Sequence, residues 1–176
     1  SLTDIETCWY TNDTNTVNVT LANCGNVTTV TWSEGNHNVT VWANDSAGNE
    51  NHSSISFTID TGVPLVNLLG PANSSNYTTL IISFAANFTN TALVNATPYV
   101  WNSSMDLINS TETQTVHGVE NSTNVSVILP IDDVYHWNYL VCDQANNCAW
   151  NNTNYTVGVD SIVPAITIVS PTNNTN

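Results

Sequence analysis

The sequence predicts an all-β chain made of tandem antiparallel β-sandwiches. The first observation is that apolar and polar residues alternate with a period of two in short segments, which is typical of half-buried strands. The second is that turn residues separate these segments and that no segment shows helical periodicity. The third is a repeat of about 100 residues, the usual size of an immunoglobulin or fibronectin III sandwich.

Two stretches of the chain recur and indicate where the domains begin and end. Residues 61–76 (TGVPLVNLLGPANSSN) match residues 161–176 (SIVPAITIVSPTNNTN) at an offset of 100. Residues 34–49 (EGNHNVTVWANDSAGN) match residues 132–147 (DDVYHWNYLVCDQANN) at an offset of 98. A fixed repeat of this size indicates tandem domains.

The ends of the chain are out of phase with these domains. We predict a complete domain over residues 61–160 and an incomplete domain, lacking its first strands, over residues 1–60. Residues 161–176 then supply the first strand of a following repeat, or a donor strand for a neighbouring subunit. Either the chain is cut from a longer tandem array, or its tail fills the gap in another copy. The donor strand of the second alternative consists of Ala165, Ile166, Thr167, Ile168 and Val169.

Strands are expected wherever an alternating segment lies between turn residues. In chain order these segments are residues 16–21, 27–32, 55–60, 65–69, 79–88, 124–129, 155–160 and 165–169. Two further strands each have a row expected to face the core, namely His37, Val39, Val41 and Ala43, and Tyr135, Trp137, Tyr139 and Val141. Asn38, Thr40, Trp42 and Asn44 then face outward. His37 takes the position of Tyr135, where an Ig-like domain often uses a ring to lock a strand corner.

The charge of the chain excludes several functions. It has no Lys or Arg and 14 Asp and Glu residues, for a net charge of −14. Nucleic acid binding is excluded, because phosphate contacts need cationic side chains. The same argument excludes anionic membrane surfaces, and no apolar stretch reaches the roughly 20 residues that cross a bilayer.

Seventeen Asn-x-Ser/Thr motifs occur in the chain. Chance in an Asn- and Thr-rich sequence is one interpretation. Glycosylation is the other, and we prefer it because sugars would solvate a surface with few charges. The acceptor residues are Asn12, Asn18, Asn26, Asn38, Asn44, Asn51, Asn73, Asn76, Asn87, Asn95, Asn102, Asn109, Asn121, Asn124, Asn151, Asn154 and Asn173.

Four cysteines occur as two locally spaced pairs, and no His lies near either pair in a zinc-ligand pattern. We therefore predict two disulfides, Cys8 with Cys24 between neighbouring strands and Cys142 with Cys148 around a hairpin. Disulfides persist outside the cytosol, so we expect an extracellular location.

Catalytic motifs are absent from the sequence, and we predict that the protein is not an enzyme. It has no Gly-x-Ser-x-Gly, phosphate-binding glycine loop or His-Glu-x-x-His. Its four His residues are dispersed, and we expect packing or surface roles for them. We expect no cofactor apart from N-linked glycans.

Acidic residues near the domain joints are candidate calcium ligands. Asp60 and Asp160, with Asp132 and Asp133 nearby, would stiffen the array if they bound calcium. For Asp45 in the ANDSAGN segment we prefer a turn, in which its carboxylate accepts hydrogen bonds from backbone amides.

Three short motifs resemble those of a known family. They are ANDSAGN, the joint from Asp60 to Pro64, and the hairpin CWYTNDTNTVNVTLANC, and they are similar to the Ig-like repeats of large archaeal and bacterial surface proteins. The resemblance spans most of the chain and implies a fold far better than an activity. The second repeat departs from the family pattern, with DQANNC in place of the Asp-x-Ala-Gly-Asn turn.

We expect a structural subunit of a glycosylated extracellular filament or cell-surface array, whose partner is itself in a head-to-tail polymer or tandem array. An adhesin or carbohydrate-binding module is the alternative, with other cells or surface glycans as partners, and an accessory domain of a secreted hydrolase is a third. The six Trp residues keep the second alternative open. For Trp137 we expect core packing, and for Trp42 an outward face beneath glycans or a neighbouring subunit.

Overall fold

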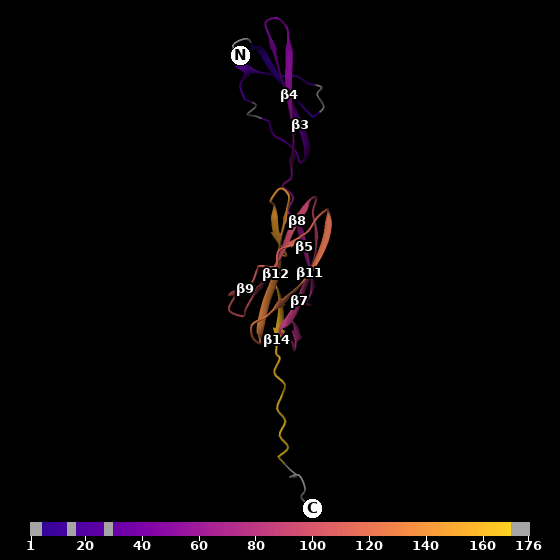
Figure 1. The fold of residues 1–176 in the computed structure, drawn as a ribbon, viewed down its shortest axis with the longest axis vertical. Coiled ribbons are helices and arrows are strands. Elements are labelled where there is room, and N and C mark those ends of the chain that lie inside the picture. The colour runs from indigo at the N-terminus through magenta and orange to yellow at the C-terminus, as the bar shows by residue number, and fades with distance from the viewer. Residues whose placement is uncertain (1–4, 14–16, 27–29, 170–176) are drawn as a thin grey trace, which may run out of the picture. The chain divides into compact units, whose positions relative to one another are not determined.

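The computed structural model describes residues 5–13, 17–26 and 30–169 (Figure 1). The chain divides into two compact units, Ser1–Thr61 and Gly62–Asn176. Both units are built from strands, and the described ranges contain no α-helix and hence none that could cross a membrane. The predicted all-β fold class is therefore confirmed.

The second unit is a β-sandwich of two sheets. The larger sheet has the order β10-β8-β12-β14-β6, with β9 beside β8 and β13 beside β12, and the smaller sheet has the order β11-β7-β5. The pairs are antiparallel, except that β14 and β6 are parallel. The strands, most of them labelled in Figure 1, are β5 (Leu65–Gly70), β6 (Ser75–Tyr77), β7 (Ile81–Thr89), β8 (Leu93–Trp101), β9 (Leu107–Asn109), β10 (Gln114–Thr115), β11 (Glu120–Ile128), β12 (Asp133–Asp143), β13 (Cys148–Trp150) and β14 (Tyr155–Val159).

Alternating burial in β12 and β7 forms the core of this unit. Tyr135, Trp137 and Tyr139 of β12 are fully buried, as predicted for the core-facing row. Phe84 of β7 packs against Trp137 with ring centroids 5.2 Å apart, and its carbonyl accepts a hydrogen bond from the Tyr139 hydroxyl at 2.8 Å. Burial raises the pKa of Tyr139 to about 12, so the hydroxyl stays protonated and can donate. Ring packing and a buried hydrogen bond thus join the two sheets.

The alternation rule does not predict β8, although β8 lies inside the larger sheet. Pro98 interrupts this segment, and proline is rare in central strands because it has no N–H to donate. Pro98 is paired with Tyr139 of β12, but on its other side β8 meets β10 only at residues 95–96 and β9 only at residues 100–101. Among the described strands, β8 therefore has one neighbour at Pro98, which is the edge-like position that proline tolerates.

The first unit is a single sheet within the described residues. Its order is β2-β1-β3-β4, and every pair is antiparallel. The elements are β1 (Ile5–Asn12), β2 (Val19–Leu21), the 3₁₀ turn η2 (Ala22–Cys24), β3 (Gly35–Asp45) and β4 (Glu50–Ile59). The strand expected over residues 16–21 is thus shorter than predicted, and its first residue lies outside the described part.

The strand predicted over residues 27–32 is wrong for its described part. Residues 30–33 belong to no strand, and residues 27–29 lie outside the described residues. By its place before β3, this segment corresponds to β11, which precedes β12 and pairs with β7 alone. The described part of the first unit has no counterpart of β7. An alternating segment without a partner strand does not form a sheet.

The two repeat offsets have one structural explanation. β3 and β12 both end at an aspartate whose carboxylate accepts hydrogen bonds from the turn that follows. Asp45 accepts from the backbone and side-chain amides of Asn49, and Asp143 accepts from the same two groups of Asn147. The returning strand differs, because β4 is continuous whereas the second unit divides it into β13 and β14. The connection between β13 and β14 adds two residues, which changes the offset from 98 to 100.

Both predicted disulfides are formed. Cys142 and Cys148 are paired positions of the β12–β13 hairpin. Cys8 of β1 is bonded to Cys24, which lies in η2 directly after β2 and not on the strand itself. The bonded residues are 6 and 16 positions apart. In the chain-entropy model these loops contribute about 2 and about 3 kcal/mol respectively.

Truncating the cross-sheet contact tests this core. Phe84→Ala should lower the free energy of unfolding of the second unit by about 3–5 kcal/mol, because the fully buried ring leaves a cavity. Ile128→Ala is the matched control, since Ile128 is 75% exposed on β11, and we expect a change below about 0.5 kcal/mol. Urea unfolding followed by Trp fluorescence measures both, and equal losses would contradict the two-layer core.

Candidate functional site

The first unit leaves part of its apolar sheet face uncovered. In the row of β3 predicted for the core, His37 and Val39 are buried, but Val41 is 40% exposed and Ala43 is half-buried. Ile55 of β4, which pairs with Val39, is 63% exposed. We call Val41, Ala43 and Ile55 the open strip. The prediction that the whole row lies in a core is therefore wrong for Val41, because nothing in the described part of the unit covers it.

The segment between β2 and β3 closes the other part of this face. Trp32 packs against His37 and Phe57 with ring centroids 4.9 Å and 5.0 Å apart. Cys8 is 5% exposed, beside its disulfide partner Cys24. The open strip is therefore confined to the β3–β4 half of the sheet.

The C-terminal segment carries apolar side chains without a packing partner. Residues 161–169 pair with no described strand (Figure 1). Ile166 and Ile168 are 88% and 81% exposed, whereas Val66 and Leu68, which occupy the matching positions of β5, are 4% and 5% exposed. The strand predicted over residues 165–169 is thus not formed within this chain, and its donor role stays a prediction.

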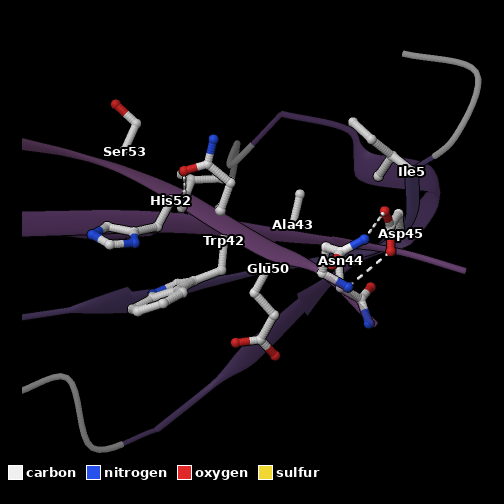
Figure 2. Close-up of a pocket in the computed structure, with 11 residues that line it drawn as sticks. Ile5, Trp42, Ala43, Asn44, Asp45, Glu50, His52 and Ser53 are labelled. Carbon is white, nitrogen blue, oxygen red and sulfur yellow. Dashed lines mark hydrogen bonds between the residues drawn. The ribbon is translucent and has the colours of Figure 1, made fainter. Parts of the chain in front are cut away.

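Aromatic rings form a row on the opposite face of the first sheet. Trp9, Trp42 and His52 occupy paired positions on β1, β3 and β4, and Figure 2 shows Trp42 beside His52. The ring centroids are 6.3 Å apart for Trp9 and Trp42 and 4.3 Å apart for Trp42 and His52. Trp42 therefore lies on the predicted face, but its neighbours half bury it. Thr40, also expected to face outward into solvent, is 5% exposed.

A shallow pocket of about 550 Å³ lies along the β3–β4 hairpin (Figure 2). Its lining comes from both faces of the sheet, with Val41 and Ala43 on one and Trp42 and His52 on the other. Ligand sites are usually enclosed and have convergent polar groups. This open hollow at a sheet edge has the character of a contact surface.

His37 locks a strand corner in the way that Tyr135 does. The Tyr135 hydroxyl donates to the carbonyl of Ile131, four residues earlier, at 2.7 Å. Nε2 of His37 lies 2.8 Å from the carbonyl oxygen of Ser33, also four residues earlier, so this nitrogen carries a proton. Nδ1 of His37 lies 3.1 Å from Asp13. The predicted equivalence of His37 and Tyr135 is confirmed.

The partners of His37 shift its titration. The Ser33 carbonyl and then the Asp13 carboxylate raise the pKa of His37 above its ordinary value. The backbone N–H of Asn38 and then His37 lower the pKa of Asp13. The sequence holds no signal for Asp13, because this residue follows the end of β1 and meets His37 only through the pairing of β1 with β3.

The predicted glycosylation sites differ in what their side-chain amides do. Nδ2 of Asn151 donates to the carbonyl of Val66 in the other sheet at 2.8 Å. Asn44 accepts from the backbone N–H of Thr7 at 3.1 Å through Oδ1, and its Nδ2 makes no hydrogen bond in the described part of the chain. A sugar on Nδ2 therefore disturbs fewer contacts at Asn44 than at Asn151. Asn173 lies outside the described residues.

The acidic residues considered for calcium have hydrogen-bond partners. Asp132 accepts from the backbone N–H of Ser161 at 3.0 Å, and Asp133 from that of Ser103 at 3.2 Å. Asp160 accepts from the backbone two residues ahead at 3.0 Å. Across residues 5–13, 17–26 and 30–169, no group of three or more His, Cys, Asp or Glu could hold a metal ion.

The strand corner at His37 predicts that the stability of the first unit depends on pH. Because the folded-state pKa of His37 is raised, its contribution to stability is complete below the unfolded value of about 6.5 and is lost as the pH rises through the folded value. The melting temperature of the first unit should therefore fall between pH 5.5 and pH 9. His37→Tyr, which copies the corner of the second unit, should remove this fall.

Circular dichroism melts of both proteins across this pH range measure the effect. Protonation of the many carboxylates also changes stability with pH, and comparing the wild-type chain with His37→Tyr cancels that background. The same pH slope in both proteins would show that His37 does not titrate with folding.

Comparison with known proteins bears on the first unit. Residues 3–61 match the family model described as a bacterial Ig-like domain. No curated protein matches the chain. A solved structure with a weak likeness is the crystal structure of dimeric latent PorU from Porphyromonas gingivalis, with 15% identity and a TM-score of 0.39, over 73% of this chain and 12% of that one. The chain thus spans a small part of that protein. Residues 3–61 are similar in sequence to a bacterial Ig-like domain, in agreement with the all-β fold of the chain.

Proposed function

We propose that this protein is a structural subunit of a glycosylated extracellular filament or cell-surface array. In this assembly residues 165–169 of one copy cover the open face of the first unit of the next copy, so that copies join head to tail. One observation carries the proposal: the first unit has an uncovered apolar strip, while the tail repeats the apolar pattern of β5, whose inward side chains Val66 and Leu68 are buried in the second unit.

The surface chemistry supports an extracellular structural role. The chain has no Lys or Arg, so its surface cannot be solvated by mixed charges, and its seventeen acceptor motifs would supply sugars instead. Two disulfides suit an oxidising environment. The resemblance of its motifs to surface proteins of archaea and bacteria agrees with this location. We propose no enzymatic activity and no cofactor beyond N-linked glycans.

A covalent tandem array is the other form of the same function. There the strands that cover the first unit come from the same polypeptide, and residues 161–176 begin a further domain. The match between residues 61–76 and 161–176 is equally consistent with this arrangement. Both forms cover the same apolar strip.

Carbohydrate binding, as in an adhesin, is the alternative function. The observation that favours it is the row of Trp9, Trp42 and His52, in which the two indole planes lie 3° apart. The rings pack against each other, however, and the predicted acceptors Asn38 and Asn44 flank Trp42 on the same strand face. This arrangement suits shielding beneath the protein's own sugars better than capture of a foreign glycan.

Electron microscopy of native material tests the proposed function. We expect axially repeating density in which residues 165–169 lie against residues 1–60 of the next copy, or continuous covalent density through both ends. Discrete monomers that bind glycans in an array assay would instead favour the adhesin alternative and contradict the structural role.

Mass spectrometry of the native protein tests its glycosylation. The unmodified chain has a mass of 19.0 kDa, and we expect a higher and heterogeneous mass. Peptide mapping should find sugar at Asn44 and less or none at Asn151, whose amide bonds Val66. A homogeneous mass of the bare chain would contradict glycan solvation.

A further inference from the structure

We propose that the open strip of Val41, Ala43 and Ile55 is the docking site for Ile166 and Ile168 of a second copy. The docked segment would take the place over β3 and β4 that β5 occupies in the second unit. This inference rests on the proposed function and deepens it, because it names the residues that meet and the part of the sheet they cover.

The sheet of the first unit can be aligned with the larger sheet of the second unit, because β3 and β12 begin and end with the same local structures. His37 and Tyr135 lock the same corner at the start of β3 and β12. Asp45 and Asp143 close the same turn at the end of these strands. Both pairs are separated by 98 residues, so the positions between them correspond one to one, and Val41 corresponds to Tyr139.

In the second unit β5 lies against β12 and β13. A hydrogen bond of 2.8 Å from Nδ2 of Asn151, directly after β13, to the carbonyl of Val66 fixes this placement. The inward side chains of β5 are Val66 and Leu68, and beneath this layer Tyr139 is fully buried.

In the first unit, the part of β3 and β4 that corresponds to the sheet beneath β5 is uncovered. Val41, in the position of Tyr139, is 40% exposed, and Ile55 on the neighbouring strand is 63% exposed. The β1 side of the same face is already closed, with Cys8 and Tyr10 at 5% and 9% exposed. We infer that the docked segment lies over β3 and β4, where the uncovered side chains are.

The tail has the shape that this region requires. Ile166 and Ile168 repeat the two inward positions of β5, while Thr167 between them repeats the outward Asn67. Ile166 is larger than Val66, and on the acceptor side Val41 is smaller than Tyr139. The extra methylene of Ile166 offsets a part of the volume that is lost where Val41 stands in place of Tyr139.

The net charge of the chain limits the kind of contact that two copies can make. Each copy has a net charge of −14 and no cationic residue other than His and the N-terminus, so copies repel each other at long range. The strip and residues 161–169 carry no charge. The contact is therefore apolar and short-ranged, and salt should strengthen the association by screening the repulsion.

Backbone pairing sets a limit on its strength. β5 hydrogen-bonds with β7 along its length, and the described part of the first unit offers no counterpart of β7. The docked segment is thus held mainly by its side chains, so we expect association that depends on concentration.

The test uses chains of all 176 residues in which either the donor segment or the acceptor strip is altered. Ile166→Asp with Ile168→Asp removes the donor, and Val41→Asp with Ile55→Asp removes the acceptor. Thr167→Asp and Ile128→Asp are matched controls, because the Thr167 side chain faces away from the strip in the proposed docking and Ile128 is exposed on β11 of the second unit. Sedimentation velocity across protein concentration, in 0.05 M and 0.5 M NaCl, gives the size of the species.

We expect the wild-type chain and both controls to form a concentration-dependent series of oligomers that shifts to larger species in high salt. Each double variant should remain a monomer alone, and an equimolar mixture of the two should form a dimer and nothing larger. Oligomers of the donor variant equal to those of the wild-type chain would overturn the proposal. A monomeric wild-type chain under all conditions would overturn it as well.

These outcomes separate the inference from the function on which it rests. If sedimentation finds only monomers and microscopy of native material shows continuous covalent density, the structural role stands and the docking site is wrong. If the mixture forms dimers but native material shows no array, the docking site stands and the proposed function is wrong. Circular dichroism of each variant shows whether its strands are retained.

Discussion

A β-sheet with one apolar face needs a second layer, and the rest of this molecule follows from that requirement. In the second unit β5, β7 and β11 form the layer, and they bury the row of rings on β12 completely. The first unit has the sheet but, in its described part, no such layer. The segment after β2 covers part of the face instead: Trp32 packs on His37 and Phe57 at one end of β3 and β4, and Cys24 is bonded to Cys8 of β1. The open strip is what this partial cover leaves exposed, and residues 161–169 likewise pair with no described strand.

Local devices explain how the first sheet keeps its shape without a full sandwich. The corner of His37 and the turn of Asp45 depend only on residues near in sequence or on the paired strand, so they form whether or not a second layer is present. The turn also uses a positive-φ residue at the same place in both units, Gly48 with φ 83° and Asn146 with φ 67°. Glycine adopts this conformation without strain, and asparagine is one of the few other residues that tolerate it. The same short-range interactions thus fix the geometry of the sheet in both units. They do not supply the second layer of strands that covers the apolar face of the sheet.

The lack of cations shapes the outer faces. Hydroxyls and amides take the place of ion pairs there, as between Thr40 and Ser54 at 2.8 Å, Asn38 and Ser56 at 2.9 Å, and Ser83 and Ser126 at 2.8 Å. These neutral bonds are insensitive to salt and leave the carboxylates without cationic partners other than His. Copies of such a chain repel each other through charge, so the association proposed above depends on apolar contact between the tail and the open strip.

The sequence by itself determined the features that depend on short-range pattern. Alternation predicted most strands and the core rings of β12, the two offsets predicted the equivalence of His37 with Tyr135, and the Cys spacing predicted both disulfides. Tertiary structure alone decided that residues 30–33 form no strand, that Pro98 lies within β8, that Val41 is exposed and that Asp13 meets His37. The physical reason is that alternation specifies which way a side chain points. Whether that face is covered, and whether a segment finds a partner, depends on strands far away in the chain.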